Sequence, residues 1–300
     1  MMQFKNDDQF RAFMKKESAR LNISLPNVYH TFLARTLLER ISKYNNKKLL
    51  VKGSAAEAAY LGKMVRSITD VDLAGLQRFN LNKDLIKNII LNNEGEQFSF
   101  SLVKDPYTTQ TGIHKLSIAG NFGKCQQALN IDYQDNYDRL IRRTKVVMPK
   151  IFEGDTEFEM YVPSYEEYLA EKLCIILGNN KPDVMNTRLK DFYDIYNLHG
   201  SGYNAEELTK DFGIMLKKLH RVNITDADTS FLDESFIEKH KHLWVPMLER
   251  YDCLDKKTSF ERMVFYTQGV LRSELKRNGA IMPDNPNLEP PKEIVKKRTR

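Results

Sequence analysis

The chain has 300 residues, of which 41% are hydrophobic and 29% are charged, and its formal net charge at pH 7 is +6. This length predicts about two domains, and the composition is that of a globular protein with a substantial core. No apolar run approaches the roughly 18 residues of a membrane-spanning helix, and the first residues lack the apolar stretch of a secretory signal, so we expect a cytoplasmic protein without a membrane partner.

The cysteines and the last ten residues give only limited information about function. The three cysteines form no CxxC pair, which argues against a disulfide framework and a structural zinc site. The last ten residues, PKEIVKKRTR, carry five bases and one acid and so contribute +4 of the net charge. Such a segment can attract a polyanion such as RNA, although most runs of charge are simply solvated.

The first half of the chain mixes helical and strand patterns. Hydrophobic spacing predicts helices at residues 8–21, 25–44, 54–61 and 83–91. Short apolar or alternating runs predict strands at 48–52, 70–76, 98–103, 114–119, 127–133, 145–148 and 157–162.

Strand patterns stop after Pro163, and helical patterns replace them. The first helix begins with Ser164 and has Glu167 three residues later, a capping box. Further helices are predicted at residues 187–198, 205–220, 233–251 and 259–277. The predicted fold class is therefore α/β (α+β), in three parts: an α/β domain at 1–163, an all-helical domain at 164–277 and a basic tail, which we expect to be flexible, at 278–300.

Two aspartates stand one residue apart in the strand T-D-V-D-L-A. Side chains alternate along a strand, so Asp70 and Asp72 share one face while Val71 and Leu73 point into a core. Their α-carbons would be roughly 6.6 Å apart, and the carboxylates repel each other unless a cation such as Mg²⁺ or Mn²⁺ lies between them. In the alternative interpretation, the pair caps a turn or pairs with nearby Arg66.

Two further features fit a metal and phosphate site. Gly53 and Ser54 end a strand and begin a helix, where free N–H groups and the helix dipole can bind phosphate. In the run A-L-N-I-D-Y-Q-D, Asp132 faces away from Leu129 and Ile131, so it could join the pair if its strand is adjacent. A solvent-facing acid on a half-exposed strand is the alternative.

These residues carry a resemblance to a known fold and family. A strand, Gly-Ser, a helix, D-x-D and a later single aspartate resemble the nucleotidyltransferase fold shared with DNA polymerase beta. More closely, K-G-S with R-S-I-T-D-V-D-L resembles the first motif of the AbiEii-type nucleotidyltransferase toxins. That family usually has a second glycine and a threonine where this chain has Ser54 and Ser67, and Thr69 lies in a variable position. The resemblance implies a mixed sheet flanked by helices and followed by a helical domain.

A lysine lies on the apolar face of the helix after Pro163. The helical neighbours of Lys172 are Tyr168, Leu169, Ile175 and Ile176. Either the side chain extends past the core to reach water, or its ammonium meets a buried anion such as a carboxylate or a nucleotide phosphate.

The next helix carries the run R-L-K-D-F-Y-D-I. Arg188 and Asp191 lie on one helical face with Asp194 close by, and a surface ion pair is the plainer interpretation. The AbiEii-like family has an E-K-L helix followed by R-x-K-D-x-x-D-[IL], and A-E-K-L with R-L-K-D-F-Y-D-I is similar in type, order and spacing. The resemblance implies that Lys172 holds the triphosphate, that Asp191 belongs to the active site, and that Arg188 and Asp194 support it.

The favoured hypothesis is an enzyme that transfers a nucleoside monophosphate from an NTP to an acceptor hydroxyl. The residues predicted to be catalytic are Asp70, Asp72, Asp132, Lys172 and Asp191, and the metal ligands among them are Asp70, Asp72 and Asp132. The residues predicted to bind the nucleotide are Gly53, Ser54, Arg66 and Lys172. The family implies a toxin of a toxin-antitoxin or phage-defence system, with RNA such as tRNA as acceptor and a cognate antitoxin as partner.

Three alternatives stay open. The acceptor could be a protein or a small molecule, or the chain could be a catalytically silent protein that binds a nucleotide or a partner. A nuclease or phosphodiesterase is less favoured, because the sequence has no histidine near the acids and no HD pair.

Overall fold

The structure is a computed structural model, and it describes residues 3–44, 47–135, 137, 142–178, 188–220 and 234–280. The chain forms two compact units. Unit 1 comprises Met1–Pro163 with Tyr251–Leu254, and unit 2 comprises Ser164–Arg250 with Asp255–Arg300. Each unit is described by itself. The predicted tail at 278–300 lies outside the described residues from 281 onward.

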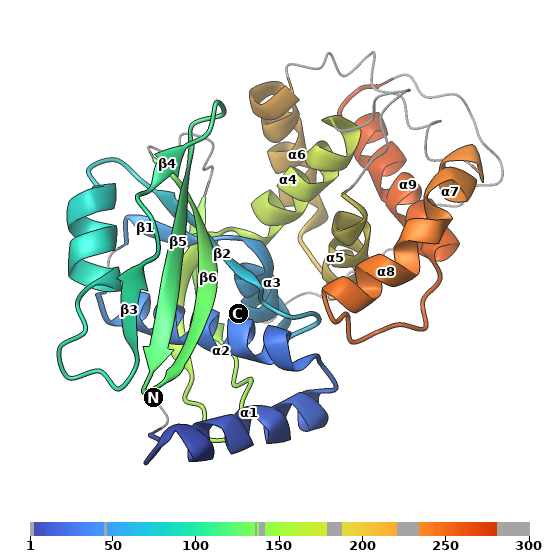
Figure 1. The fold of residues 1–300 in the computed structure, drawn as a ribbon. Helices are drawn as coiled ribbons and strands as arrows, with labels where there is room; N and C mark the ends of the chain where they lie inside the picture. Colours follow the sequence, from blue (N-terminus) through green and yellow to red (C-terminus); the bar gives the residue numbers. More distant parts are fainter. Residues whose placement is uncertain are drawn as a thin grey trace. The chain divides into compact units, whose positions relative to one another are not determined.

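A six-stranded mixed sheet forms the centre of unit 1 (Figure 1). Its strands are β1 (Leu49–Val51), β2 (Asp70–Gly75), β3 (Ser99–Leu102), β4 (Tyr107–Thr108), β5 (Ile113–Phe122) and β6 (Cys125–Gln134). The order is β1-β2-β6-β5-β3, and β4 pairs with β5. The β2–β6 pair is parallel, whereas the other pairs are antiparallel. A second, two-stranded sheet is formed by β7 (Arg143–Met148) and β8 (Phe158–Pro163).

Alternation along the strands gives the large sheet one apolar and one polar face. Along β6, Leu129, Ile131 and Tyr133 are buried, while the residues between them are half-buried or exposed. Helix α2 (Leu25–Tyr44) contacts β2 and β6, and α1 (Asp7–Leu21) packs on α2 (Figure 1). Seven phenylalanines fill the space between them in one network of ring contacts: Phe4, Phe10, Phe13, Phe32, Phe98, Phe122 and Phe152.

Buried charges fix α2 to the rest of unit 1. The Arg35 guanidinium Nε lies 2.7 Å from Asp155, and Arg40 donates to the backbone carbonyls of Ile90 and Phe98 at 3.0 and 2.8 Å. Each guanidinium is buried, so the ion pair with Asp155 and the hydrogen bonds of Arg40 offset part of the cost of removing these charges from water. These contacts hold α2 in one position against the sheet of unit 1.

Unit 1 also contains two short helices and a return of the chain from unit 2. Helix α3 (Gly53–Leu61) follows β1, and the π-helix η1 (Leu81–Ile90) follows β2. At Tyr251–Leu254 the chain re-enters unit 1, where the carboxylate of Asp252 accepts hydrogen bonds from the N–H and hydroxyl of Ser24 at 2.8 Å each.

Unit 2 is helical in its described residues. Its helices are α4 (Tyr165–Gly178), α5 (Leu189–His199), α6 (Ala205–His220), α7 (Glu234–His240), η3 (Lys241–Leu243), α8 (Trp244–Arg250) and α9 (Phe260–Arg277). Helix α4 packs against α5 and α6, and α9 packs against α5, α6 and α7 (Figure 1). The Ser164 hydroxyl accepts a hydrogen bond from the N–H of Glu167, as the predicted cap requires.

The α/β fold class expected from the sequence is confirmed, with two differences in its elements. The helix predicted at 233–251 is interrupted by the 3₁₀ turn Lys241–Leu243. Pro246 explains this interruption, because its ring would clash with the carbonyl of His242 in a continuous α-helix. The short strand β4 was not predicted. Among the described residues, no helix has both the length and the apolar character needed to cross a membrane.

Candidate active site

The three aspartates of the predicted metal site lie on two neighbouring strands of unit 1. In the parallel pairing of β2 with β6, Asp72 is the register partner of Asp132, and Asp70 is the partner of Asn130. Neighbouring strands are about 4.8 Å apart, and partners in a parallel pair point to the same face. All three carboxylates are half-buried on the polar face. The condition set for Asp132, that its strand lie next to that of the aspartate pair, is therefore met.

The backbone of Gly53 lies directly against the Asp72 side chain. Gly53 has φ +63°, and a Cβ atom built on it would lie 2.0 Å from Oδ2 and 2.9 Å from Cγ of Asp72. The neighbouring Lys52 N–H donates to the Asp72 carbonyl at 2.8 Å, which fixes the start of α3 to β2. Only glycine fits this position, because a side chain would meet both a left-handed backbone and a carboxylate.

Ser54 occupies the first turn of α3. It is 5% exposed, and within the part of the chain that the structure describes its hydroxyl oxygen is buried without a hydrogen-bond partner. A buried hydroxyl without a partner is costly unless a bound group completes its hydrogen bonds. The N-terminus of α3, Ser54 and the Asp72 carboxylate therefore adjoin in a position suited to a bound phosphate and its counter-ion.

A residue that the sequence analysis missed also faces the aspartates. Lys115 on β5 is the register partner of Asp132, and its ammonium forms an ion pair with the Asp132 carboxylate. Alternation could have placed Lys115 on the polar face of its strand, because Leu116 beside it is buried. The pairing of β5 with β6 could not be read from the sequence, so the contact could not be predicted.

A histidine of helix α2 lies near the same group. Burial lowers the pKa of His30, and the negative charge of Asp70 opposes this effect in part. The Gln127 amide donates to Nε2 of His30 at 3.0 Å, and among the described residues Nδ1 is buried without a hydrogen-bond partner. The statement that the acids have no histidine near them holds only along the sequence, since folding brings α2 to the start of β2.

Arg66, predicted to bind the nucleotide, is 3% exposed. Its Nε lies 3.7 Å from the buried carboxylate of Glu57, and its guanidinium lies over the ring of Tyr251, 5.6 Å from the centroid, within the range of a cation–π contact. The next residue, Ser67, donates its N–H and its hydroxyl to the Tyr251 carbonyl at 3.0 and 2.7 Å. These contacts hold the loop before β2, and a direct role of Arg66 toward a nucleotide stays a prediction.

The second group of predicted residues lies together in unit 2. The Lys172 ammonium on α4 is 3.0 Å from Asp191 and 2.7 Å from Asp194 on α5, and Arg188 donates to Asp191 at 2.8 Å. Lys172 is 7% exposed, and both aspartates are fully or almost fully buried. The lysine on the apolar face therefore meets buried carboxylates, and the alternative in which it extends to water is wrong.

Charges balance within this cluster. Burial alone would raise the pKa of Asp191, but the positive charges of Lys172 and Arg188 outweigh that effect and lower it below the ordinary value. Two cations thus face two anions in this group. Any further role of Lys172 toward a phosphate requires that its ammonium be shared with these carboxylates.

The predicted site residues therefore form two groups. Gly53, Ser54, Asp70, Asp72 and Asp132 belong to unit 1, and Lys172, Arg188, Asp191 and Asp194 belong to unit 2. The convergence of both groups on one nucleotide stays a prediction.

Comparisons with known proteins decide the family. The model of the family described as "Nucleotidyl transferase AbiEii toxin, Type IV TA system" matches residues 36–265. The chain belongs to the AbiEii family. It is thus a nucleotidyltransferase of a family of toxins, as the motifs in the sequence indicated. No curated protein matches it in sequence.

Two solved structures are similar to this chain. MenT4, a nucleotidyltransferase toxin from Mycobacterium tuberculosis H37Rv, is similar with a TM-score of 0.54 and 12% identity, covering 87% of this chain and 98% of that chain. JHP933 from Helicobacter pylori is similar with a TM-score of 0.48 and 16% identity, covering 85% of this chain and 96% of that chain. At such identities the MenT4 likeness supports the fold alone.

The residues of this AbiEii-family chain suit a divalent metal by their chemistry. Carboxylate oxygens on one sheet face are the ligands that Mg²⁺ and Mn²⁺ prefer. Because Gly53 has no side chain, Oδ2 of Asp72 can face the start of α3. Within the described ranges, no three Asp, Glu, His or Cys side chains are gathered closely enough to hold an ion as they stand. Asp132 is paired with Lys115, so metal binding requires that this ion pair open.

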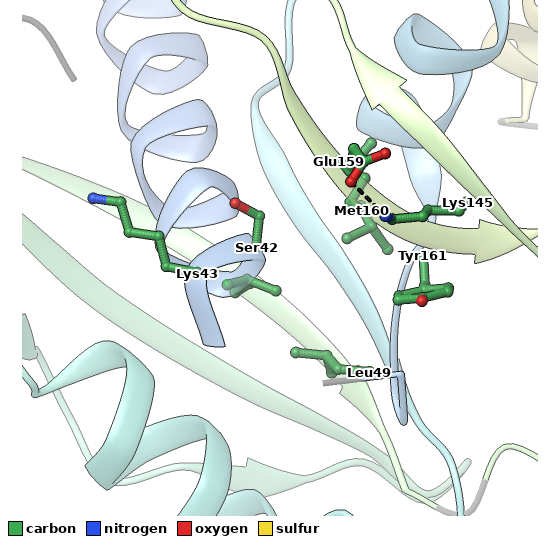
Figure 2. Close-up of a pocket in the computed structure, with 9 residues that line it drawn as sticks. Ser42, Lys43, Leu49, Lys145, Glu159, Met160 and Tyr161 are labelled. Carbon is green, nitrogen blue, oxygen red and sulfur yellow. Dashed lines mark ion pairs between the residues drawn. The ribbon is translucent and has the colours of Figure 1, made fainter. Parts of the chain in front are cut away.

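A separate pocket of about 350 Å³ lies between the end of α2, β1 and the β7–β8 hairpin (Figure 2). Figure 2 shows Lys145 paired with Glu159 on its rim, with Ser42 and Tyr161 facing the same space. None of the predicted site residues is among the described residues that line this pocket. We therefore assign the candidate active site of this AbiEii-family chain to the polar sheet face and not to this pocket.

Proposed function

We propose that this chain is a metal-dependent enzyme that transfers a nucleoside monophosphate from an NTP to an acceptor hydroxyl and releases pyrophosphate. The observation that carries the proposal is the register that sets Asp72 beside Asp132, with the Gly53 backbone against the Asp72 carboxylate. Membership of a nucleotidyltransferase family supports the reaction class.

The residues of unit 1 would divide the work as follows. The start of α3, with the Ser54 hydroxyl, binds triphosphate oxygens through hydrogen bonds. Asp70, Asp72 and Asp132 would hold Mg²⁺ or Mn²⁺, which when bound would neutralise phosphate charge and activate the attacking hydroxyl. As the acceptor oxygen bonds to the α-phosphorus, the bond to pyrophosphate would break, and Asp132 would accept the hydroxyl proton.

In unit 2, Lys172 would neutralise charge on the triphosphate, with Asp191 holding the ammonium in place and Arg188 and Asp194 in support. This role needs both groups of residues to meet one nucleotide. Their agreement with the two motifs of the AbiEii family supports it.

We further propose that the acceptor is RNA such as tRNA, that the transfer makes the protein a toxin, and that a cognate antitoxin counteracts it. The family description supports the toxin and antitoxin. The basic segment PKEIVKKRTR is compatible with an RNA acceptor, since Lys and Arg attract phosphate backbones.

The deciding experiment incubates the protein with each α-labelled NTP and Mg²⁺, together with total tRNA, total protein or small-molecule hydroxyl acceptors. We expect label on RNA, and a loss of at least about a hundredfold in Asp72→Asn because a metal-binding charge is removed. Absence of transfer to any acceptor, or undiminished transfer by Asp72→Asn, would contradict an enzymatic role. Label on protein or a small molecule alone would keep the chemistry and replace the acceptor.

One observation favours a second candidate, a catalytically silent protein that binds a nucleotide or a partner. The Lys115–Asp132 ion pair supplies the positive charge that a metal would otherwise provide at that carboxylate. If this pair is permanent, an NTP should bind without transfer, and Mg²⁺ should not change its affinity. Calorimetric titration of ATP with and without Mg²⁺ separates the two candidates.

A further inference from the structure

A second pocket in unit 1 lies where α1 and α2 meet the β5–β6 turn. It has a volume of about 250 Å³ and is lined by aromatic residues that include Phe10, Tyr29, Phe98 and Phe122, with Arg11 and Lys124 at its edge. Ligand pockets for whole small molecules usually measure about 300–1,000 Å³. This pocket is therefore suited to a single planar ring system more than to a complete NTP.

The aromatic rings that line the pocket are closely packed. The rings of Phe10 and Phe122 lie 4.9 Å apart, and those of Phe98 and Phe122 lie 5.0 Å apart. These three phenylalanines are buried, whereas Tyr29 is half-buried and packs its ring against Phe10 with centroids 5.7 Å apart. Tyr29 is therefore the ring that can present a face to a ligand without disturbing the core.

The charge at the pocket edge favours an anionic ligand beside that ring. Arg11 and Lys124 both line the pocket. Asp7 also lies here, and its carboxylate accepts a hydrogen bond from the Lys124 backbone N–H at 2.8 Å, which leaves the lysine ammonium for other contacts. Arg11 contacts the Cys125 sulfur with its Nε at 3.2 Å. An aromatic face beside two cations is the combination that binds single-stranded nucleic acids.

The pocket lies on the apolar face of the large sheet, because Gln127, which lines it, is in phase along β6 with the buried Leu129. Gln127 lines the pocket, and its amide donates to His30, whose pKa responds to the charge of Asp70. Along β6, Gln127 lies three residues before Asn130, the register partner of Asp70, so its side chain and the aspartates are on opposite faces of the sheet. An RNA strand bound at both places would therefore pass around the end of the sheet.

We propose that this pocket binds one base of a single-stranded RNA acceptor, stacked on Tyr29, with the adjoining phosphate held by Arg11 and Lys124. The inference rests on the proposed nucleotidyl transfer to RNA and assigns the site that selects the acceptor.

The first test uses Cys125, which lines the pocket and is half-buried, whereas Cys174 and Cys253 are buried. Alkylation of the full chain by iodoacetamide is followed by mass spectrometry, with the single-stranded RNAs rA6 or rU6 or with ATP added. We expect either RNA to slow Cys125 alkylation at least tenfold at saturation, and ATP to have little effect. No protection by RNA, or equal protection by ATP, would overturn the proposal.

The second test measures affinity for fluorescent rA6 by anisotropy. Tyr29→Leu should weaken binding on the order of tenfold, while Tyr29→Phe should retain it because the ring remains. Arg11→Gln and Lys124→Gln should each weaken binding and reduce its salt dependence. The matched controls are Tyr107→Leu, an exposed tyrosine, and Lys16→Gln, which lies on α1 outside the lining of the pocket.

These outcomes separate the pocket from the reaction. Label transfer to RNA that Tyr29→Leu leaves unchanged would refute the pocket and keep the proposed function. Protection of Cys125 by RNA without any label transfer would keep the pocket and refute the proposed function. If Tyr29→Leu fails to fold, as judged by circular dichroism, the Cys125 protection assay on the unmodified chain still decides.

Discussion

The backbone of Gly53, at the start of α3, is in direct contact with the carboxylate of Asp72 on β2. A Cβ atom at position 53 would lie 2.0 Å from Oδ2 of Asp72, and the residue has φ +63°. The same position therefore requires glycine for two reasons, its backbone conformation and the space that the carboxylate occupies. A mutation can separate these reasons because the chain offers a second glycine with the same conformation.

Gly53→Ala should abolish nucleotidyl transfer, with a loss of at least about a hundredfold, because the new methyl group displaces the Asp72 carboxylate. The control is Gly62→Ala at the end of α3, where φ is +64° and a Cβ atom would meet nothing within 4 Å. Both changes should cost about 1–2 kcal/mol in backbone strain. Label transfer and thermal unfolding measure the two effects. Equal activity of the two variants would contradict the contact.

The Lys115–Asp132 pair predicts a competition between lysine and metal. Lys115→Gln should increase the stabilisation of the protein by Mg²⁺, because no ammonium then competes for the Asp132 carboxylate. The half-exposed pair itself should contribute under about 1 kcal/mol to stability in the absence of metal. Thermal unfolding with increasing Mg²⁺ provides the measurement.

Lys145→Gln is the matched control, because Lys145 forms a similar cross-strand pair with Glu159 in the β7–β8 hairpin. It should leave the Mg²⁺ dependence unchanged. A Lys115→Gln variant with the same Mg²⁺ dependence as the unmodified protein would argue that Asp132 is not a metal ligand.

The sequence allowed the faces of the strands to be predicted, but not their neighbours. Alternation placed Asp70, Asp72 and Asp132 opposite buried apolar residues, because side-chain direction is a local property of an extended chain. Which strand lies beside β2 depends on the packing of the whole sheet. For this reason the contacts of Lys115 and His30 with the acidic group emerged only from the structure.

The same distinction applies to the helices. Helical periodicity placed Lys172 on an apolar face, and packing of α4 against α5 supplied the two carboxylates that satisfy it. Periodicity also continued the helix through Pro246, where the missing N–H and the clash with a preceding carbonyl shorten it. The local pattern of a helix thus predicts which side chains are buried. It does not predict the partner of a buried charge, because that partner comes from another element.

In the buried cluster of unit 2, we expect removal of Lys172 to lower stability much more than removal of Arg188. Lys172→Met should destabilise unit 2 by about 3–5 kcal/mol, because it leaves Asp191 and Asp194 buried without the ammonium between them. Arg188→Gln should cost under about 1 kcal/mol, because the arginine side chain is 40% exposed. Urea unfolding followed by circular dichroism gives both values.

A triple variant tests whether uncompensated charge causes the loss. Lys172→Met with Asp191→Asn and Asp194→Asn should recover part of the stability, since neutral amides replace the buried carboxylates. If the triple variant is less stable than Lys172→Met alone, packing and not charge dominates the cluster.

His199 predicts a pH dependence of stability in unit 2. It is 7% exposed, its Nδ1 contacts the Tyr266 hydroxyl, and burial, with a smaller effect of the Arg277 charge, lowers its pKa from 6.5 to about 4. The unfolded chain therefore binds a proton at a higher pH than the folded chain. The contribution of neutral His199 to the free energy of unfolding is fully present above pH 6.5. It is lost as the pH drops from 6.5 towards 4, by about 3 kcal/mol in total.

His199→Gln should flatten this part of the stability profile, because glutamine carries no titrating group and can still contact Tyr266. The control is His242→Gln, which removes an exposed histidine of the same unit. Urea midpoints of the three proteins between pH 7.5 and 4, with the pH at which each loses stability, provide the measurement. If His199→Gln loses as much stability over this interval as the unmodified protein, other groups that burial keeps neutral, such as His240, control the acid sensitivity.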